Sequence, residues 1–194
     1  PEGCFYKSGV GPAAQAAGLE VMLPTPDRFE ELAIGRYRDE SGQLAGQPGE
    51  ALDRWPFFYA PFRDATKVIG IAPCKDHNLS GASLSMKNFY GLLGGRRNQF
   101  HQHIHSIISD FPLMIQPTLV ILDATRILMR HGPTGGSLAD VKPGNTIAVA
   151  TDMVALDSFG YTLFERRGPA PEYLAKAEQR GLGSTAWQSL AKEV

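Results

Sequence analysis

The sequence predicts an α/β protein with a mostly parallel sheet flanked by helices. Two observations lead to this prediction: short β-branched apolar runs of strand length, and longer stretches between them with apolar residues at helical spacing. With 194 residues, 43% of them hydrophobic, the chain is long enough to bury one sizeable core. We therefore expect a single domain over residues 1–194, and because the chain begins at Pro1 rather than at methionine, we expect an upstream portion to precede it.

Four short apolar runs are predicted strands. The first follows a small-residue helix candidate at 11–17, in the helix-then-strand order of an α/β unit. The other three are β-branched and continuously apolar, as strands covered on both faces are. The four runs are 18–23, 67–72, 118–124 and 146–150.

Two longer stretches predict helices. In 97–111 the apolar residues form one stripe, and Pro112 is expected to end the helix. The stretch 152–167 shows a similar stripe and begins at Asp152, a suitable N-cap. Asp157 borders the apolar face of this second helix, where a carboxylate needs a partner.

Residues 35–62 interrupt the alternation with an irregular, aromatic-rich excursion. The segment is rich in glycine, proline and charge and then strongly aromatic, so we expect a hairpin or an irregular flap. Its aromatic end, 55–62, is expected to pack on the core or on another copy of the chain, which makes a homo-oligomer through this segment one expectation.

Composition and charge exclude several classes of function. Nineteen basic and twenty acidic residues give a formal charge of -1, so no basic field indicates nucleic acid as a partner. No apolar run approaches the roughly twenty residues of a membrane-spanning helix. Cys4 and Cys74 are the only cysteines, so this chain alone cannot supply the four thiolates of an iron-sulfur cluster. A disulfide between them and two separate thiols stay open, as do a cytoplasmic location and export after removal of a leader.

The predicted strands carry ionisable residues at or after their ends. In open parallel sheets, ligands bind beyond the carboxyl ends of the strands. Lys75 and His77 follow one predicted strand, Asp123 ends the next, and Asp152 follows the last. This placement predicts a small-molecule or metal site there, with His77 and Asp123 as candidate ligands of a divalent metal.

Three further motifs each have a functional and a structural interpretation. His101 and His105 are spaced to share a metal ion on one flank of a helix, although the arginines at 96 and 97 favour an anion there. The glycine-rich loop 131–137 fits an anion-binding nest or a plain turn. Lys87 fits a base or anion-binding group of lowered pKa, or a side chain that extends to water.

Three separated motifs together resemble a known family. "KDHNLSGASLSMKNFYGLLGG", "LVILDATRILMRHGPTGG" and "IAVATDMVALDSFGYTLFERRG", with the later "YLAKAEQRGLG", resemble the uncharacterised conserved family known as domain of unknown function 362, over about 67–183. The departures are Ala124 for a glycine, Met153 for a proline, and a proline displaced to Pro73. These departures concern turns rather than polar side chains.

The resemblance implies a set of site residues. Lys75, His77, Lys87 and Asp123 would carry chemistry, and the other motif positions would bind ligand. Those other positions are Asn88, Gly132, Thr134, Gly135, Asp152 and Asp157. It also implies an upstream α/β portion. Many relatives are fused to iron-sulfur domains or exported, but the missing cysteines weigh against a redox role for this chain alone.

Two hypotheses of function follow. In the first, Lys75, His77 and Lys87 bind or polarise an anionic small molecule, while an aspartate binds a cation or accepts a proton. In the second, the protein is a non-catalytic binding or redox-accessory module, and the motif residues hold the fold through caps and buried pairs. Convergence of these side chains around a cleft would favour the first.

Overall fold

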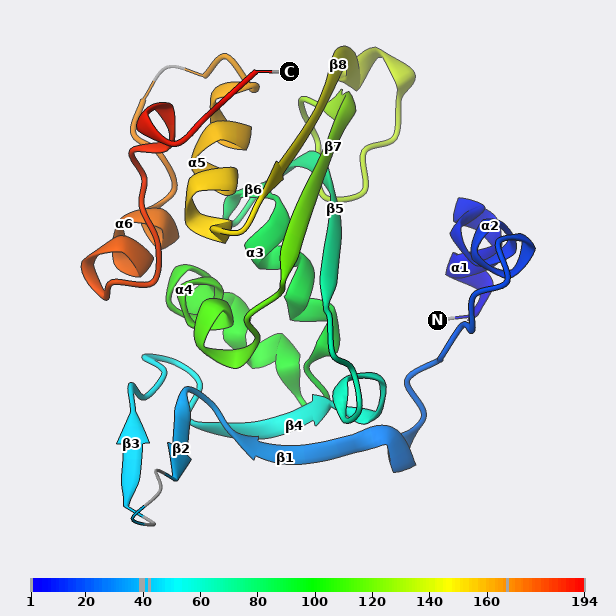
Figure 1. The fold of residues 1–194 in the computed structure, drawn as a ribbon. Coiled ribbons are helices and arrows are strands. Elements are labelled where there is room, and N and C mark those ends of the chain that lie inside the picture. The colour runs from blue at the N-terminus through cyan, green and yellow to red at the C-terminus, as the bar shows by residue number, and fades with distance from the viewer. Residues whose placement is uncertain (1, 39–40, 42, 167, 194) are drawn as a thin grey trace.

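The computed structural model describes residues 2–38, 41, 43–166 and 168–193. Its main sheet has four strands in the order β6-β5-β7-β8, and helices cover one face of it (Figure 1). The strands of this sheet are β5 (Ile69–His77), β6 (Gly81–Ser83), β7 (Leu119–Leu128) and β8 (Val141–Ala150). The helices are α1 (Glu2–Ser8), α2 (Val10–Ala16), α3 (Ser85–Asn88), α4 (Ile104–Met114), α5 (Met153–Thr162) and α6 (Glu172–Gln179).

The α/β class is confirmed, but the mostly parallel sheet is wrong. Only β5 and β7 run parallel within this sheet, whereas β6 and β8 pair antiparallel with their neighbours. A parallel connection needs a crossover of a dozen or more residues, usually a helix. The segment 129–140 between β7 and β8 instead holds a Gly-Pro turn and one short 3-10 helix, so the chain reverses.

Three of the four predicted strands are present and all three extend further than expected: β5 and β7 at their carboxyl ends and β8 at its amino end. β5 continues to His77, so Lys75 and His77 lie within the strand rather than in a loop after it, and β7 continues to Leu128, so Asp123 lies in the middle of its strand rather than near the end. The predicted strand at 18–23 is wrong, because this segment is extended chain without strand pairing. Pro24 and Pro26, which follow it, donate no backbone hydrogen bond to a neighbouring strand.

The two predicted helices form with altered boundaries. α5 begins after Asp152, whose Oδ1 accepts hydrogen bonds from the amides of Val154 and Ala155, as predicted for an N-cap. The first predicted helix is a 3-10 helix from Arg97 to His103 followed by α4. Pro112 lies inside α4 and does not end it; the helix ends where Ile115 turns extended.

The excursion at 35–62 contributes short antiparallel strands. β1 (Phe29–Ala33) pairs with β4 (Arg54–Phe58), and β2 (Arg36–Arg38) pairs with β3 (Leu44–Gly46) as a hairpin. In the aromatic segment Phe57 is buried, and the Trp55 ring meets the Phe100 ring edge-on at 4.7 Å. This segment therefore packs on its own chain, and the expected homo-oligomer stays a prediction.

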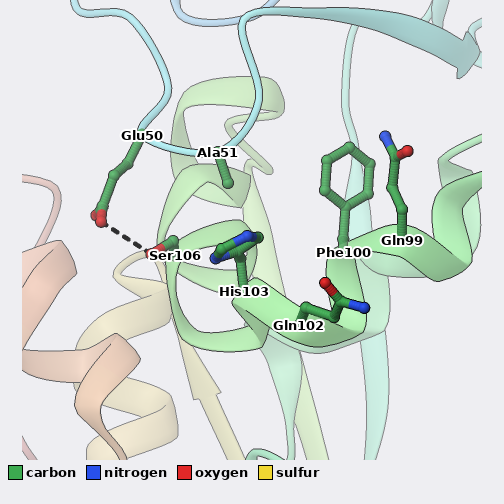
Figure 2. A pocket seen from close by; sticks show the side chains of 7 residues that line it. All are labelled: Glu50, Ala51, Gln99, Phe100, Gln102, His103 and Ser106. Atoms are coloured by element: carbon green, nitrogen blue, oxygen red, sulfur yellow. Dashed lines mark hydrogen bonds between the residues drawn. The ribbon is translucent and has the colours of Figure 1, made fainter.

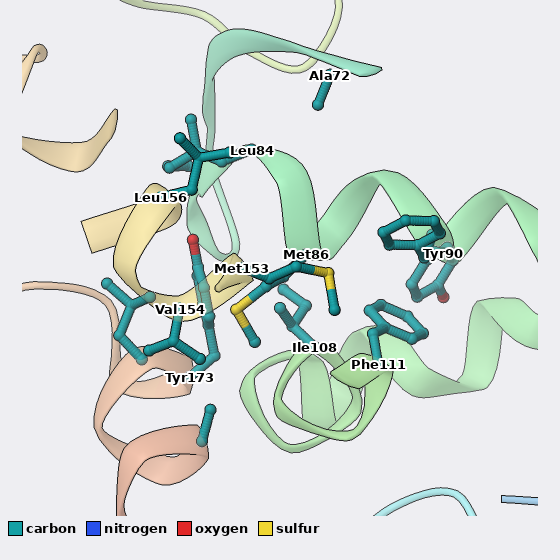
Figure 3. Close-up of a cluster of buried hydrophobic side chains, with 14 of the residues drawn as sticks. Ala72, Leu84, Met86, Tyr90, Ile108, Phe111, Met153, Val154, Leu156 and Tyr173 are labelled. Carbon is teal, nitrogen blue, oxygen red and sulfur yellow. The ribbon is translucent and has the colours of Figure 1, made fainter. Parts of the chain in front are cut away.

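The core lies between the main sheet and the helices. Met86 from α3, Ile108 and Phe111 from α4 and Val154 from α5 meet there, as Figure 3 shows. All four side chains are buried. The core therefore fixes α3 and α5 against β5 and β7, the strands that carry the predicted site residues.

The opposite face of the sheet is open and apolar. Ile69 and Ile71 alternate with buried neighbours on β5, Ile147 and Val149 alternate with partly buried neighbours on β8, and each of the four is more than half exposed. α1 and α2 form a separate pair of helices, joined to the rest by the extended segment 17–25 (Figure 1). Among the described residues no helix is long and apolar enough to cross a membrane.

Candidate functional site

The structure brings Lys75, His77 and Lys87 together at the carboxyl end of β5. Lys75 and His77 are two residues apart on this strand, and Lys87 comes from α3, which packs against β5. Their mutual electrostatic effects show the proximity: the charge of Lys75 acts on both Lys87 and His77. Three residues of the first motif are therefore close together, and their role in a site stays a prediction.

Lys87 is a half-buried lysine of this site whose pKa is lowered. Burial, and then the charge of Lys75, lowers the pKa of Lys87 to about 8. Its Nζ lies 5.3 Å from the centre of the Tyr90 ring, a favourable cation-π arrangement. About a tenth of such a lysine is neutral at pH 7, so it can take up or release a proton under ordinary conditions.

His77, in the same site as Lys87, is uncharged at neutral pH. Burial, followed by the charges of Lys87 and His101, lowers the pKa of His77 to about 4. Its Nδ1 accepts hydrogen bonds from the amides of Leu79 and Ser80 at 3.2 and 3.3 Å, which leaves the proton on Nε2. His77 therefore serves as an uncharged donor rather than a cation.

Three side chains outside the set implied by the resemblance complete the cluster, and two of them, Arg97 and His101, belong to the histidine motif of the sequence analysis. Tyr90 lies between Lys87 and Arg97, whose guanidinium carbon is 6.0 Å from the ring centre. The Tyr90 hydroxyl donates to the backbone oxygen of Arg97 at 2.6 Å and lies 3.4 Å from Nδ1 of His101. We call Lys75, Lys87, Arg97 and His101, together with the neutral His77 and Tyr90, the cationic cluster. The sequence signal for Tyr90 was its position three residues after Lys87, which places the two side chains on one side of a helical turn.

The remaining polar motif residues near β5 have structural roles. Asn88 donates from Nδ2 to the backbone oxygen of Ile71 at 3.0 Å, which attaches α3 to the strand edge. The Gly132 amide donates to Asp76 at 2.8 Å, and a Cβ at Gly132 would lie only 1.8 Å from the Asp76 backbone oxygen. Only glycine fits there, so the glycine-rich loop acts as a turn clamped onto β5. Its Thr134 is exposed and its Gly135 amide bonds back to His131.

Asp123 lies on the open face of the sheet, apart from the cationic cluster in its contacts. It pairs in register with Pro73, and its Oδ1 accepts from the amide and hydroxyl of Thr125 at 3.0 and 2.7 Å. These bonds lower the pKa of Asp123. Among the described residues, no hydrogen bond or ion pair joins it to Lys75 or Lys87.

Asp152 and Asp157 hold the fold, and the expected convergence of three strand ends is wrong for Asp152. Since β8 is antiparallel to β7, Ala150 pairs with Val120 near the start of β7. Asp152 therefore lies at the opposite end of the strands from His77. Its second oxygen accepts from the Ser184 amide at 2.9 Å. Asp157 is fully buried and accepts from Ser85, Met86 and Tyr173.

The histidine pair of the predicted metal site separates. His101 lies against Tyr90, with ring centres 5.5 Å apart, whereas His105 stacks on Tyr173 at 6.2 Å. Within the described part of the chain, no group of three or more His, Cys, Asp or Glu side chains is placed to hold a metal ion. Cys74, buried beside this region, is a free thiol whose pKa is raised to about 12, chiefly by burial.

A cavity of about 390 Å³ lies elsewhere, between the loop at Glu50 and the 3-10 helix Arg97–His103 with the start of α4 (Figure 2). Its lining includes Glu50, His103 and Phe100, none of which the sequence analysis placed in a site. Glu50 is already bonded to the Ser106 hydroxyl and to Lys176, both at 2.8 Å. Lys176 lowers the pKa of Glu50, and this carboxylate therefore stabilises the fold.

Comparison with known families identifies the chain at the level of a family. The family model of a domain of unknown function, DUF362, matches residues 1–162 of the 194. The chain belongs to the DUF362 family. The DUF362 match includes the N-terminal third, which the motif resemblance did not reach, and it ends at residue 162, within the third of the motifs that resemble the family. No curated protein and no solved structure matches the chain, so DUF362 membership supplies no reaction.

Proposed function

We propose that this DUF362 protein binds a small anionic ligand, through a carboxylate or phosphate group, at the cationic cluster. The observation that supports it most is the pair of half-buried lysines: neither Lys75 nor Lys87 forms an ion pair with another described residue. Burying positive charge without a partner is unfavourable. A bound anion would relieve this cost.

Lys87 is the proton-transfer group of the proposed site. With its pKa at about 8 it exchanges a proton near neutral pH, while neutral His77 donates a hydrogen bond. Asp123, Asp152 and Asp157 are occupied by local bonds, so no carboxylate is assigned a reacting role. Because no carboxylate is assigned a reacting role, the proposed activity is ligand binding. Any reaction at the site would depend on Lys87.

The first test measures sulfate binding by calorimetry, because the charge of sulfate is constant over the relevant pH range. We expect Lys87→Met and Lys75→Met to weaken binding by about 10- to 100-fold, as expected for loss of a charged hydrogen bond. Lys67→Met is the matched control, since Lys67 is exposed at the other end of β5. Equal affinities in all four proteins would reject the proposal.

The pH dependence gives a second readout of the same site. Lys87 loses its charge as the pH rises through about 8, so sulfate affinity should fall over that range. Lys87→Met should remove this dependence. A wild-type affinity that is constant from about pH 6 to about pH 9 would contradict the role of Lys87.

A further inference from the structure

Arg97 is a third cation of the cationic cluster, and its guanidinium is oriented with one side free. Its Nη1 donates to the backbone oxygens of Gly91 and Leu93 at 3.0 and 3.2 Å. Among the described residues, neither its Nε nor its Nη2 has a hydrogen-bond partner. The two carbonyl oxygens therefore hold the planar guanidinium in one orientation, and its remaining N–H groups are available to a ligand.

Arg97 and the two lysines occupy separate positions around the Tyr90 ring. The guanidinium carbon of Arg97 lies 6.0 Å from the ring centre, and Nζ of Lys87 lies 5.3 Å from the same centre. Burial and then the charge of Lys75 lower the pKa of Lys87, without a resolved contribution from Arg97. The charge of Arg97 acts on Tyr90 instead. Lys75 and Lys87 thus form one position, and Arg97 forms a second.

The Tyr90 ring between these positions is held in place. Its hydroxyl donates to the backbone oxygen of Arg97 at 2.6 Å, and Phe111 meets the ring edge-on with centres 6.1 Å apart (Figure 3). Lys87 and Arg97 therefore lie no farther apart than the sum of their two distances from the ring centre. This limit is the reach of a small molecule.

The cations at both positions lack a carboxylate partner. Asp76, which follows Lys75, forms its ion pair with Arg166. None of Lys75, Lys87 and Arg97 has an ion pair in the part of the chain that the structure describes. Since electrostatic attraction falls with distance, one anionic group close to the lysines compensates Arg97 only weakly. Two anionic groups in one molecule compensate both positions.

We propose that the ligand of the cationic cluster is a short dianion, with one anionic group bound by Lys75 and Lys87 and the other by Arg97. This inference rests on the proposed function and adds the class of ligand. The guanidinium fork matches the oxygens of carboxylate and of phosphate alike. The shared chemistry is therefore two carboxylates or two phosphates joined by a few bonds.

Two matched pairs of probes test the second anionic group by calorimetry on the full chain. Succinate and its monomethyl ester are similar in size but differ by one anionic group, as do methylenediphosphonate and methylphosphonate. We expect the dianion of at least one pair to bind about tenfold more tightly or better, as expected for one further charged hydrogen bond. The pair that shows this preference identifies the anionic group.

Equal affinities within both pairs would overturn the inference. Sulfate binding that is weakened in Lys87→Met would in that case still support the proposed function, because sulfate carries a single anionic group. Loss of the dianion preference together with absence of sulfate binding would reject both.

Substitutions of neighbouring arginines show whether Arg97 binds the second group. Arg96 is exposed and lies outside the cationic cluster, so Arg96→Gln is the matched control. We expect Arg97→Gln to remove the preference for the dianion and Arg96→Gln to retain it. Arg97→Lys keeps the charge but not the fork, so its preference should lie between those of wild type and Arg97→Gln.

Thermal unfolding is measured in parallel, because Arg97 also bonds two backbone oxygens. If Arg97→Gln does not fold, Arg97→Lys decides the question, and its preference should be lower than in Arg96→Gln. A preference as strong as in wild type in either folded Arg97 variant would show that Arg97 does not bind the second group.

Discussion

Asp157 joins α5 to α3 through a carboxylate that is fully buried. It accepts hydrogen bonds from the Ser85 amide at 2.8 Å, the Ser85 hydroxyl at 2.5 Å and the Met86 amide at 3.2 Å. These bonds favour the ionised form, but burial outweighs them and raises the pKa of Asp157 to about 7. Asp157, which the resemblance implied as a ligand-binding residue, therefore anchors the N-terminus of α3.

Substitution of Asp157 should change stability in a pH-dependent way. Because the folded-state pKa is raised, its contribution is full below about pH 4 and is lost as the pH rises through about 7. We expect Asp157→Asn to lower the free energy of unfolding by about 1–3 kcal/mol at about pH 5 and by less at about pH 8. The asparagine side-chain NH2 group would face a backbone N–H, so two donors would meet and a hydrogen bond would be lost. Urea unfolding at both pH values measures the difference.

The pH dependence of stability that His77 contributes has the opposite sign. It is the same in wild type and in Asp157→Asn, so it cancels when the two proteins are compared. Its lowered pKa removes stability as the pH falls from about 6.5 toward about 4, in wild type and variant alike. A difference between the two proteins that grows with pH would mean that Asp157 is ionised in the neutral folded protein.

Asp110 connects three elements and was not singled out by the sequence. From α4 it accepts from the amides of Glu50, Ala51 and Leu52 at 2.7–2.9 Å, and from the Arg180 guanidinium at 2.6 Å. One fully buried carboxylate thus holds the turn before β4 and the end of α6 against α4.

Removing this carboxylate should be among the costliest polar substitutions in the protein. Asp110→Asn leaves the largely buried Arg180 without its charge partner, so we expect a loss of about 3–5 kcal/mol of unfolding free energy. In the double variant with Arg180→Met the losses should be clearly less than additive, as denaturant unfolding of all three proteins would show. Additive losses would mean that the two side chains act separately.

At the level of elements, the sequence predicted individual strands and helix starts, but it did not predict how these elements are oriented and packed against one another. The valine- and isoleucine-rich runs identified β5, β7 and β8, and Asp152 identified the start of α5. The direction of β8 depends on the loop 131–137, whose glycines fitted a nest as well as a reversal. Lys75 and Lys87 come close together only because α3 packs back along β5. The spacing of residues in the sequence does not predict this tertiary contact.

In the whole molecule, one face of the main sheet stays open although it is apolar. Ile71, Ile121 and Val149 adjoin across β5, β7 and β8, because their registers pair Ile71 with Ile121 and Ile121 with Val149. The sequence pattern predicted cover on both faces, and the helices described cover only one. Asp123 lies at the margin of this open face, beside Pro73 and Ile147.

Charged substitutions can test whether the open face is uncovered in solution. We expect Val149→Lys to change the free energy of unfolding by no more than about 0.5 kcal/mol and to reduce binding of an apolar dye. Val120→Lys, on the covered face of the neighbouring strand, should unfold the protein. Strong destabilisation by Val149→Lys would mean that another surface covers this face.

The antiparallel pairing of β7 with β8 has a consequence for the order of folding. These strands are separated by only the segment 129–140, so they can pair at little cost in chain entropy. β5 joins β7 in parallel only when the intervening 78–118 has condensed into α3 and α4. The carboxyl end of β5, with Lys75 and His77, pairs with β6 across only residues 78–80, so this part forms locally, and the parallel junction of β5 with β7 is the step that is assembled late.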